Sequence, residues 1–304
     1  MEQIHNIIYV LLFTLSLSVS ASKAFVIDSK SWQYNGHHIG YEVANPVIES
    51  SSSTSTCSEC PILLLNGFGV GSFHQHRLMP NLISVPSSSN DHHKEGDNNI
   101  TRTVYGIDYL GQGRSWPIDC NDGNSENEKG LIYSIDTWVD QIIDFIEMVI
   151  IPNHSSKTNY DSSEIDKKKV HLIGNSVGGH LSAILAAKRP DLVESICLLN
   201  ATPVWGLNLP FWSGVLPPPP IPRKIGRVLF DKIRDLATIE QYLDNAYSSR
   251  DAFDEELMKQ IRACTEGKGG HAAFASIMWS PPTVSMSFFI VCLSINHDDP
   301  NIIY

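Results

Sequence analysis

The sequence predicts an α/β domain in which a mostly parallel sheet carries helices on both faces, with an inserted helical cap. Between residues 61 and 199, apolar runs alternate with segments of helical periodicity, which is typical of parallel strands joined by crossover helices. A Pro-rich block and several helical stretches then interrupt the alternation, and an apolar run returns at residues 289–295. The 304 residues suffice for one large domain of this class.

The strands are predicted from turn chemistry and from continuous apolar runs. Asn35-Gly36, a dipeptide that favours two-residue hairpin turns, separates residues 32–34 from residues 37–43. Residues 61–65 are apolar throughout, as expected of a strand that is buried on both faces. The polar segment 84–99 is predicted to be a loop. Further strands are expected at residues 104–108, 170–173 and 193–199.

Helices are predicted where apolar residues recur at helical spacing. Residues 134–151 place their apolar side chains on one face. Residues 176–188 form a second predicted helix, which ends before Pro190. After Trp205, four consecutive prolines and several short helical stretches interrupt the strand pattern, and we interpret this block as a cap inserted over the site. Its helices are expected at residues 225–236, 239–246 and 253–264.

The chain accordingly divides into four predicted parts. Residues 30–205 form the core, residues 206–283 form the cap, and residues 284–304 form either a partial return to the core or an aberrant tail. Residues 1–22 are a signal-like or targeting segment. Their apolar run is too short for a membrane-spanning helix, and the small residues that follow it resemble a signal-peptide cleavage site, although no Lys or Arg precedes the run.

Charge and cysteine usage exclude several classes of protein. A net charge of −11 leaves no basic field to collect phosphates, so we expect no nucleic-acid partner. The six cysteines are scattered, unlike those of a disulfide-stapled domain. Cys57-x-x-Cys60 lacks a second Cys or His pair at zinc-ligand spacing, so we interpret it as a loop with two thiols rather than half of a zinc site or a redox pair.

The strongest chemical signal is Gly174-Asn175-Ser176-Val177-Gly178, between an apolar strand and a helix. The G-x-S-x-G pattern in this context predicts the nucleophile elbow of α/β-hydrolases, a strained turn that lifts the serine hydroxyl above the sheet edge. Gly174 and Gly178 have no side chains, so strand and helix can approach closely. Ser176 is therefore the predicted nucleophile.

A second glycine-rich loop, Asn66 to Ser72, follows the predicted strand at residues 61–65. In a hydrolase this loop contributes one amide of the oxyanion hole, which predicts the N–H of Phe68, with the N–H of Val177 as the second donor. Gly67 and Gly69 let the backbone turn its amides toward a substrate oxygen. The alternative is the phosphate loop of a dinucleotide-dependent oxidoreductase, but G-x-G-x-G departs from the G-x-G-x-x-G spacing of that loop.

A third glycine-containing segment, Asp108 to Ser115, follows the strand predicted at residues 104–108. We interpret it as a tight turn that supports the site. Asp108 is not the predicted catalytic acid, because the acid of this fold follows a later strand, in the chain order Ser, Asp or Glu, His.

Together these motifs resemble the plant pheophytinase-like branch of the α/β-hydrolases, over residues 32 to 282. The resemblance implies hydrolysis of the phytyl ester of pheophytin or a related chlorophyll derivative, no metal or organic cofactor, and a chloroplast location. It also implies a hydrophobic ester substrate, contact with membrane surfaces through that substrate, and no obligate protein partner. The matching stretches are residues 67–74, 108–113, 174–179, 198–206 and 273–278.

This sequence departs from the family at two places. Asn66 stands where many relatives in the wider superfamily carry His. At the C-terminus, residues 290–300 match the family strand and loop that bear the triad acid, which makes Asp299 the candidate acid. The family's last strand, closing helix and triad His come later, so we expect this chain to lack them. His297 precedes the candidate acid and would act as the base only in an unconventional order.

Two hypotheses therefore follow from the sequence. The first is a serine carboxylic ester hydrolase of the pheophytinase-like type. The second is a catalytically inactive α/β-hydrolase that lacks the triad His, in which residues 283–304 are unrelated to the family. The location is likewise open between the chloroplast, from the resemblance, and the secretory pathway, from the N-terminal segment.

Overall fold

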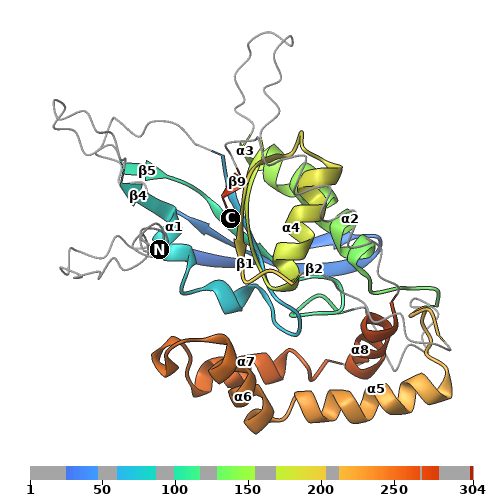
Figure 1. Cartoon of the computed structure of the whole chain (residues 1–304). Coiled ribbons are helices and arrows are strands. Elements are labelled where there is room, and N and C mark those ends of the chain that lie inside the picture. The colour runs from blue at the N-terminus through green and yellow to red at the C-terminus, as the bar shows by residue number, and fades with distance from the viewer. Residues whose placement is uncertain are drawn as a thin grey trace, which may run out of the picture.

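The structure is a computed structural model with one principal sheet and a separate helical layer (Figure 1). Several sequence predictions lie outside the described residues. They are the signal-like segment, Cys57, the strand at residues 289–295, and the candidates His297 and Asp299. The described residues are 25–46, 60–86, 99–116, 129–154, 169–202, 212–267, 269–280 and 302–303.

The described strands form a seven-stranded sheet in the order β1-β2-β6-β3-β7-β8-β9. The first two pairings, β1 with β2 and β2 with β6, are antiparallel, and all the others are parallel. This confirms the predicted mostly parallel sheet. The strands are β1 (Val26–Tyr34), β2 (His37–Asn45), β3 (Ile62–Leu65), β6 (Val104–Ile107), β7 (Val170–Asn175), β8 (Val193–Leu199) and β9 (Ile302–Ile303).

The hairpin and the two faces of the sheet follow from local chemistry. Asn35 and Gly36 take positive φ values of 48° and 81°, as a two-residue hairpin turn requires. Along β3, Leu63 packs into one apolar cluster and Leu64 into another, because successive side chains point to opposite faces. Both residues are fully buried, so the continuous apolar run did predict a strand covered on both sides.

Helices cover both faces. The face of Leu63 is covered by α2 (Ile135–Phe145), its π-helical continuation Ile146–Ile150 and α4 (Val177–Lys188) (Figure 1). The opposite face packs against α1 (Met79–Ile83), which was not predicted. The remaining core elements are η1 (Ser72–Gln75), α3 (Ile151–His154), β4 (Ser84–Pro86) and β5 (Asn99–Thr101).

The pairing of β4 with β5 corrects the predicted loop at residues 84–99, whose two ends form a short antiparallel ladder. The polar composition suggested a loop because only three residues at each end take part in pairing. A ladder of this length carries too few alternating apolar positions to be recognised in the sequence.

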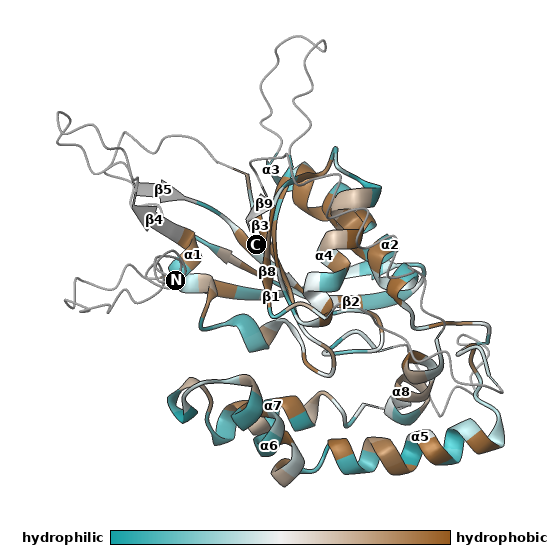
Figure 2. Ribbon diagram, viewed as in Figure 1, coloured by the Kyte–Doolittle hydropathy of each residue, from teal (hydrophilic) through white to brown (hydrophobic). Residues whose placement is uncertain are grey.

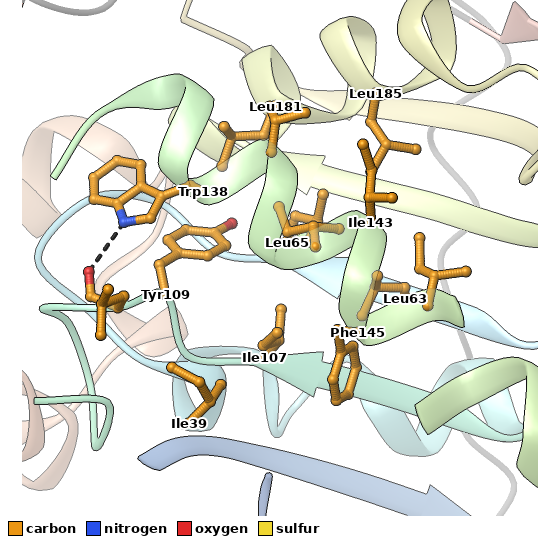
Figure 3. Close-up of a cluster of buried hydrophobic side chains, with 14 of the residues drawn as sticks. Ile39, Leu63, Leu65, Ile107, Tyr109, Trp138, Ile143, Phe145, Leu181 and Leu185 are labelled. Carbon is orange, nitrogen blue, oxygen red and sulfur yellow. Dashed lines mark hydrogen bonds between the residues drawn. The ribbon is translucent and has the colours of Figure 1, made fainter. Parts of the chain in front are cut away.

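Figure 3 shows the main core between the sheet and helices α2 and α4. Side chains of Leu63, Leu65 and Ile107 from the strands meet Ile143 of α2 and Leu181 of α4 there. Trp138 is fully buried, and its indole N–H donates to the carbonyl oxygen of Leu110 at 3.0 Å. The large buried aromatic ring therefore keeps its polar edge satisfied.

The cap forms a helical layer beyond the carboxyl ends of the strands (Figure 1). Its first helix begins at Pro220, five residues before the predicted start, because proline is tolerated in a first turn, where its missing N–H has no partner to lose. The last helix was not predicted, since its sequence is apolar on almost every side. The cap elements are α5 (Pro220–Ile233), α6 (Leu236–Ala246), η4 (Arg250–Ala252), α7 (Glu255–Ala263) and α8 (Gly270–Trp279).

Helix α8 joins the cap to the core. A Cβ atom on Gly226 of α5 would lie 2.8 Å from the Cβ atom of Ala275, so α5 and α8 are in close contact. On its other side, the hydroxyl of Ser276 accepts a hydrogen bond from the backbone N–H of Tyr133 in the core at 3.2 Å. Among the described residues, no helix is both long and apolar enough to span a bilayer.

Truncation of Leu63 tests the central role of β3. Leu63→Ala should lower the free energy of unfolding by about 2 to 5 kcal/mol, because the fully buried side chain leaves a cavity in close-packed surroundings. Val228→Ala, on the 70% exposed side chain of α5, should change it by less than about 0.5 kcal/mol. Urea unfolding of both variants measures the difference, and equal losses would contradict the assigned core.

Candidate active site

Ser176 sits at the kink between β7 and α4. Its backbone adopts φ 53° and ψ −118°, a conformation that costs a non-glycine residue about 1 to 3 kcal/mol. The surrounding chain holds it there. The N–H of Ser176 donates to the carbonyl of Leu199 at the end of β8, and the carbonyl of Ser176 accepts from the N–H groups of Gly179 and Thr202.

Three glycines allow the chain segments around this kink to approach one another. A Cβ on Gly178 would lie 2.1 Å from the carbonyl oxygen of Leu65, at the end of β3. A Cβ on Gly174 would lie 2.4 Å from the carbonyl oxygen of Gly178, and one on Gly179 would lie 2.6 Å from the Cβ of Ala201. Since real Cβ atoms do not approach other atoms so closely, any side chain at these positions would push α4 away from the strand ends.

The Ser176 side chain is half-buried, and its hydroxyl lies 3.1 Å from the hydroxyl of Thr202. Within the described residues, the Ser176 hydroxyl forms its hydrogen bond with the Thr202 hydroxyl. The sequence assigned no role to Thr202, which follows β8 and reaches the kink because β7 and β8 are neighbours. A threonine hydroxyl can orient the Ser176 Oγ, but it is too weak a base to deprotonate it.

The predicted oxyanion loop lies next to Ser176. A Cβ on Gly67 would lie 3.4 Å from the Ser176 Cβ and 3.3 Å from the Asn175 side-chain oxygen. Phe68 follows Gly67 directly, and Val177 is the fully buried first residue of α4. Gly67, the residue before Phe68, and Val177 therefore adjoin Ser176 from two different chain segments.

Buried side-chain amides stiffen this loop. The amide nitrogen of Asn66, which is fully buried, donates to the carbonyls of Gly67 at 3.0 Å and Val70 at 3.1 Å. The N–H of Gly69 donates to the side-chain oxygen of Gln112 at 2.6 Å. Asn66, the residue that departs from relatives with His, thus braces the loop from within.

Asp108 lies behind the site and joins two loops. One carboxylate oxygen accepts from the backbone N–H of Ser72 at 2.6 Å, and the other accepts from the N–H and the Nε of Arg114 at 2.9 and 3.0 Å. The side chain is completely buried. Both carboxylate oxygens therefore accept hydrogen bonds from the loops that follow β3 and β6. Asp108 holds these two loops together, which is a structural role.

A cleft of about 580 Å³ separates part of the cap from the strand ends. Asn175 and Leu199, the last residues of β7 and β8, line its core side. Tyr247 of the cap also lines it, and its hydroxyl lies 3.0 Å from the Nε2 atom of His74. This volume is in the range of small-molecule sites.

Polar contacts of Arg77 and His74 join the core to the cap. Arg77 bonds the carbonyl of Ala252 at 2.7 Å and the carboxylate of Asp254 at 2.6 Å. Burial lowers the pKa of His74, whose Nε2 atom shares a hydrogen bond with the Tyr247 hydroxyl. Within the described ranges, no cluster of three or more His, Cys, Asp and Glu side chains is arranged to hold a metal ion.

Comparison with known proteins adds three findings. A family model described as "Alpha/beta hydrolase family" matches residues 62–300. The chloroplastic pheophytinase of Arabidopsis thaliana is 30% identical over 254 residues, covering 72% of this chain and 45% of the relative. The chain thus spans less than half the length of that curated relative.

Solved structures share the fold at low identity. A variant of the protein aCif has a TM-score of 0.53 and 16% identity, covering 91% of this chain and 71% of that one. The haloalkane dehalogenase DatA from Agrobacterium tumefaciens has a TM-score of 0.50 and 11% identity, covering 90% and 77%. At this identity the likeness concerns the fold alone.

Substitution of Gly178 tests the close packing at the kink. Gly178→Ala should lower the free energy of unfolding by about 3 kcal/mol or more, because the new methyl group meets the Leu65 carbonyl. Gly36→Ala is the control, since its Cβ would meet nothing and only the positive φ costs about 1 to 2 kcal/mol. Equal losses in thermal or urea unfolding would contradict the assigned approach of α4 to β3.

The half-buried His74 predicts acid sensitivity. Because its pKa is lowered in the folded state, the unfolded chain binds more protons as pH falls below the ordinary histidine pKa of about 6.5. Stability should therefore be fully present above that pH and decrease below it. His74→Gln removes this titration, so its loss of unfolding free energy between pH 7.5 and 5.5 should be smaller than that of the wild type.

His38→Gln, at an exposed position on β2, is the matched control and should lose as much stability as the wild type. Urea unfolding midpoints of the three proteins at pH 7.5 and 5.5 measure the loss of stability in each. A His74→Gln variant with the same acid sensitivity as the wild type would show that His74 does not contribute.

Proposed function

The chain belongs to the alpha/beta hydrolase family, and from this membership we propose that it is a serine hydrolase that cleaves a carboxylic ester through Ser176. The observation that carries the proposal is the strained backbone of Ser176 at the turn between β7 and α4. Such strain persists only where the surroundings fix it, and it is common at nucleophiles.

In the proposed reaction, the Ser176 Oγ attacks the ester carbonyl carbon while a base takes its proton. The carbonyl oxygen becomes an oxyanion, and the N–H groups of Phe68 and Val177 stabilise it, the latter at the start of α4, where the helix dipole adds positive charge. The alcohol leaves with a proton from the same base. Water then attacks the acyl-enzyme, and the released acid frees Ser176.

The base and the acid of this scheme remain sequence predictions. Thr202 is the group hydrogen-bonded to the Ser176 Oγ among the described residues, and an alcohol does not serve as the base at neutral pH. Asp299 stays the candidate acid. His297 would serve as the base only in an unconventional order, and its segment lies outside the described residues.

For the substrate, we propose a hydrophobic ester of the phytyl type, such as pheophytin or a related chlorophyll derivative. The support is the 30% identity to the chloroplastic pheophytinase, together with a cleft that meets the strand ends next to Ser176. That relative also supports a chloroplast location, while the N-terminal segment favours the secretory pathway. No cofactor takes part in the proposed chemistry.

One observation favours a second candidate function, an inactive family member that binds a hydrophobic ligand. The Ser176 hydroxyl is paired with Thr202 rather than with an imidazole in the described part of the chain. In that case the strained turn and the cleft would be retained without turnover.

A serine-directed fluorophosphonate probe tests the proposed nucleophile. The wild type should be labelled, Ser176→Ala should not, and Ser248→Ala, at an exposed serine of the cap, should be labelled as the wild type is. Loss of a catalytic nucleophile typically lowers the rate by about 10⁴-fold or more. A folded wild-type protein that neither reacts with the probe nor releases phytol from pheophytin would favour the inactive binding protein.

A further inference from the structure

Helix α5 forms the outer side of the cap, away from the sheet (Figure 1). It contacts the rest of the protein through one stripe, in which Pro222, Gly226 and Phe230 are buried. These residues recur every four positions, which is the spacing of a single helical face. The other faces of α5 therefore carry none of its buried residues.

Apolar residues alternate with polar ones along α5 (Figure 2), and several of the apolar side chains are exposed. Four of the nine exposed large apolar side chains of the described chain lie on this helix. Ile221, Ile225 and Val228 follow the spacing i, i+4 and i+7, so they line one side of the helix, with Leu229 beside them. Their exposed fractions are 68% for Ile221, 44% for Ile225, 70% for Val228 and 38% for Leu229.

Cations are interspersed with this apolar stripe. At 100° per residue, Lys232 falls between Ile221 and Ile225 on the same face, and Lys224 lies about 40° beyond Val228 at its border. Asp231 is the acidic residue at that border, and His271 bonds its carboxylate at 3.1 Å. The face thus carries two lysines, with one carboxylate at its border, on a chain whose net charge is −11.

The mixture of lysines and aliphatic side chains distinguishes between two kinds of partner. Protein interfaces are depleted in lysine at their centre, because its charge is costly to bury there. At a bilayer surface, the lysine stem lies along the apolar layer while its ammonium group stays among the phosphates. A helix with aliphatic side chains on one face and cations within that face therefore matches a lipid surface.

We propose that the outward face of α5 docks on an anionic lipid surface. Ile221, Ile225 and Val228 enter the boundary between headgroups and acyl chains, while Lys224 and Lys232 bind lipid phosphates or carboxylates. The docking does not depend on catalysis at Ser176. Because α5 belongs to the cap, the docked protein holds the cleft between cap and core close to a membrane.

Vesicle co-sedimentation of the full chain tests the proposal. The probes are phosphatidylcholine vesicles with and without 30 mol% phosphatidylglycerol, a ratio of about one anionic lipid in three that carries the negative surface potential of natural leaflets. The wild type should bind the anionic vesicles, and binding should weaken as NaCl screens the charges. Lys224→Gln with Lys232→Gln should weaken binding about 30-fold, at about a fivefold loss for each cation.

Ile221→Ser with Val228→Ser should weaken binding at least about tenfold, through lost apolar burial. Two controls match these changes. Met148→Ser replaces a 68% exposed apolar residue on the helical layer of the core, and Lys30→Glu changes an exposed charge on β1; both should bind as the wild type does. All substituted side chains are exposed, and circular dichroism verifies that each variant is folded.

Two results would overturn the proposal. Either the wild type fails to bind anionic vesicles, or the α5 variants bind as tightly as the wild type. If the wild type fails to bind and instead forms a dimer by sedimentation that the α5 variants lose, the face belongs to a second copy of the chain.

Discussion

The close approach of α4 to the strand ends is the constraint on which the site depends. Gly174, Gly178 and Gly179 leave no room for side chains between the helix, the end of β3 and the chain that follows β8. This contact places the first turn of α4 directly after Ser176 and forces that residue into its strained backbone conformation. The cost of the strain is offset by packing elsewhere, as expected where a fold positions a reactive group.

Buried polar side chains fix the conformation of the neighbouring loops in the same way. Asp108 ties the loop after β3 to the loop after β6 through backbone N–H groups and Arg114. Asn66 and Gln112 then fix the carbonyls and the N–H of the loop that contains Phe68. Buried groups of this kind are expensive to leave unpaired, so each loop can adopt few alternatives, and the geometry beside Ser176 is set before any ligand binds.

The central elements were predictable because their signals are local. The Asn35-Gly36 turn, the continuous apolar run of β3 and the G-x-S-x-G pattern each determine the structure of a few adjacent residues. Helix α8 was missed because it is buried on nearly all sides and has no polar face to reveal its period. The pairing of Ser176 with Thr202 was missed for a different reason, since it depends on the adjacency of β7 and β8 in space.

The cap consists of two mechanically different parts. Eight of the ten residues of α8 are buried, whereas α6 buries two of its eleven and α7 one of its nine. Helix α8 is also bonded to the core through Ser276. Displacing α8 would therefore expose far more apolar surface than displacing α6 and α7. The helical pair α6 and α7 is therefore the part of the cap whose separation from the core would cost the least apolar burial, and the His74–Tyr247 contact and the bonds of Arg77 are what that separation would break.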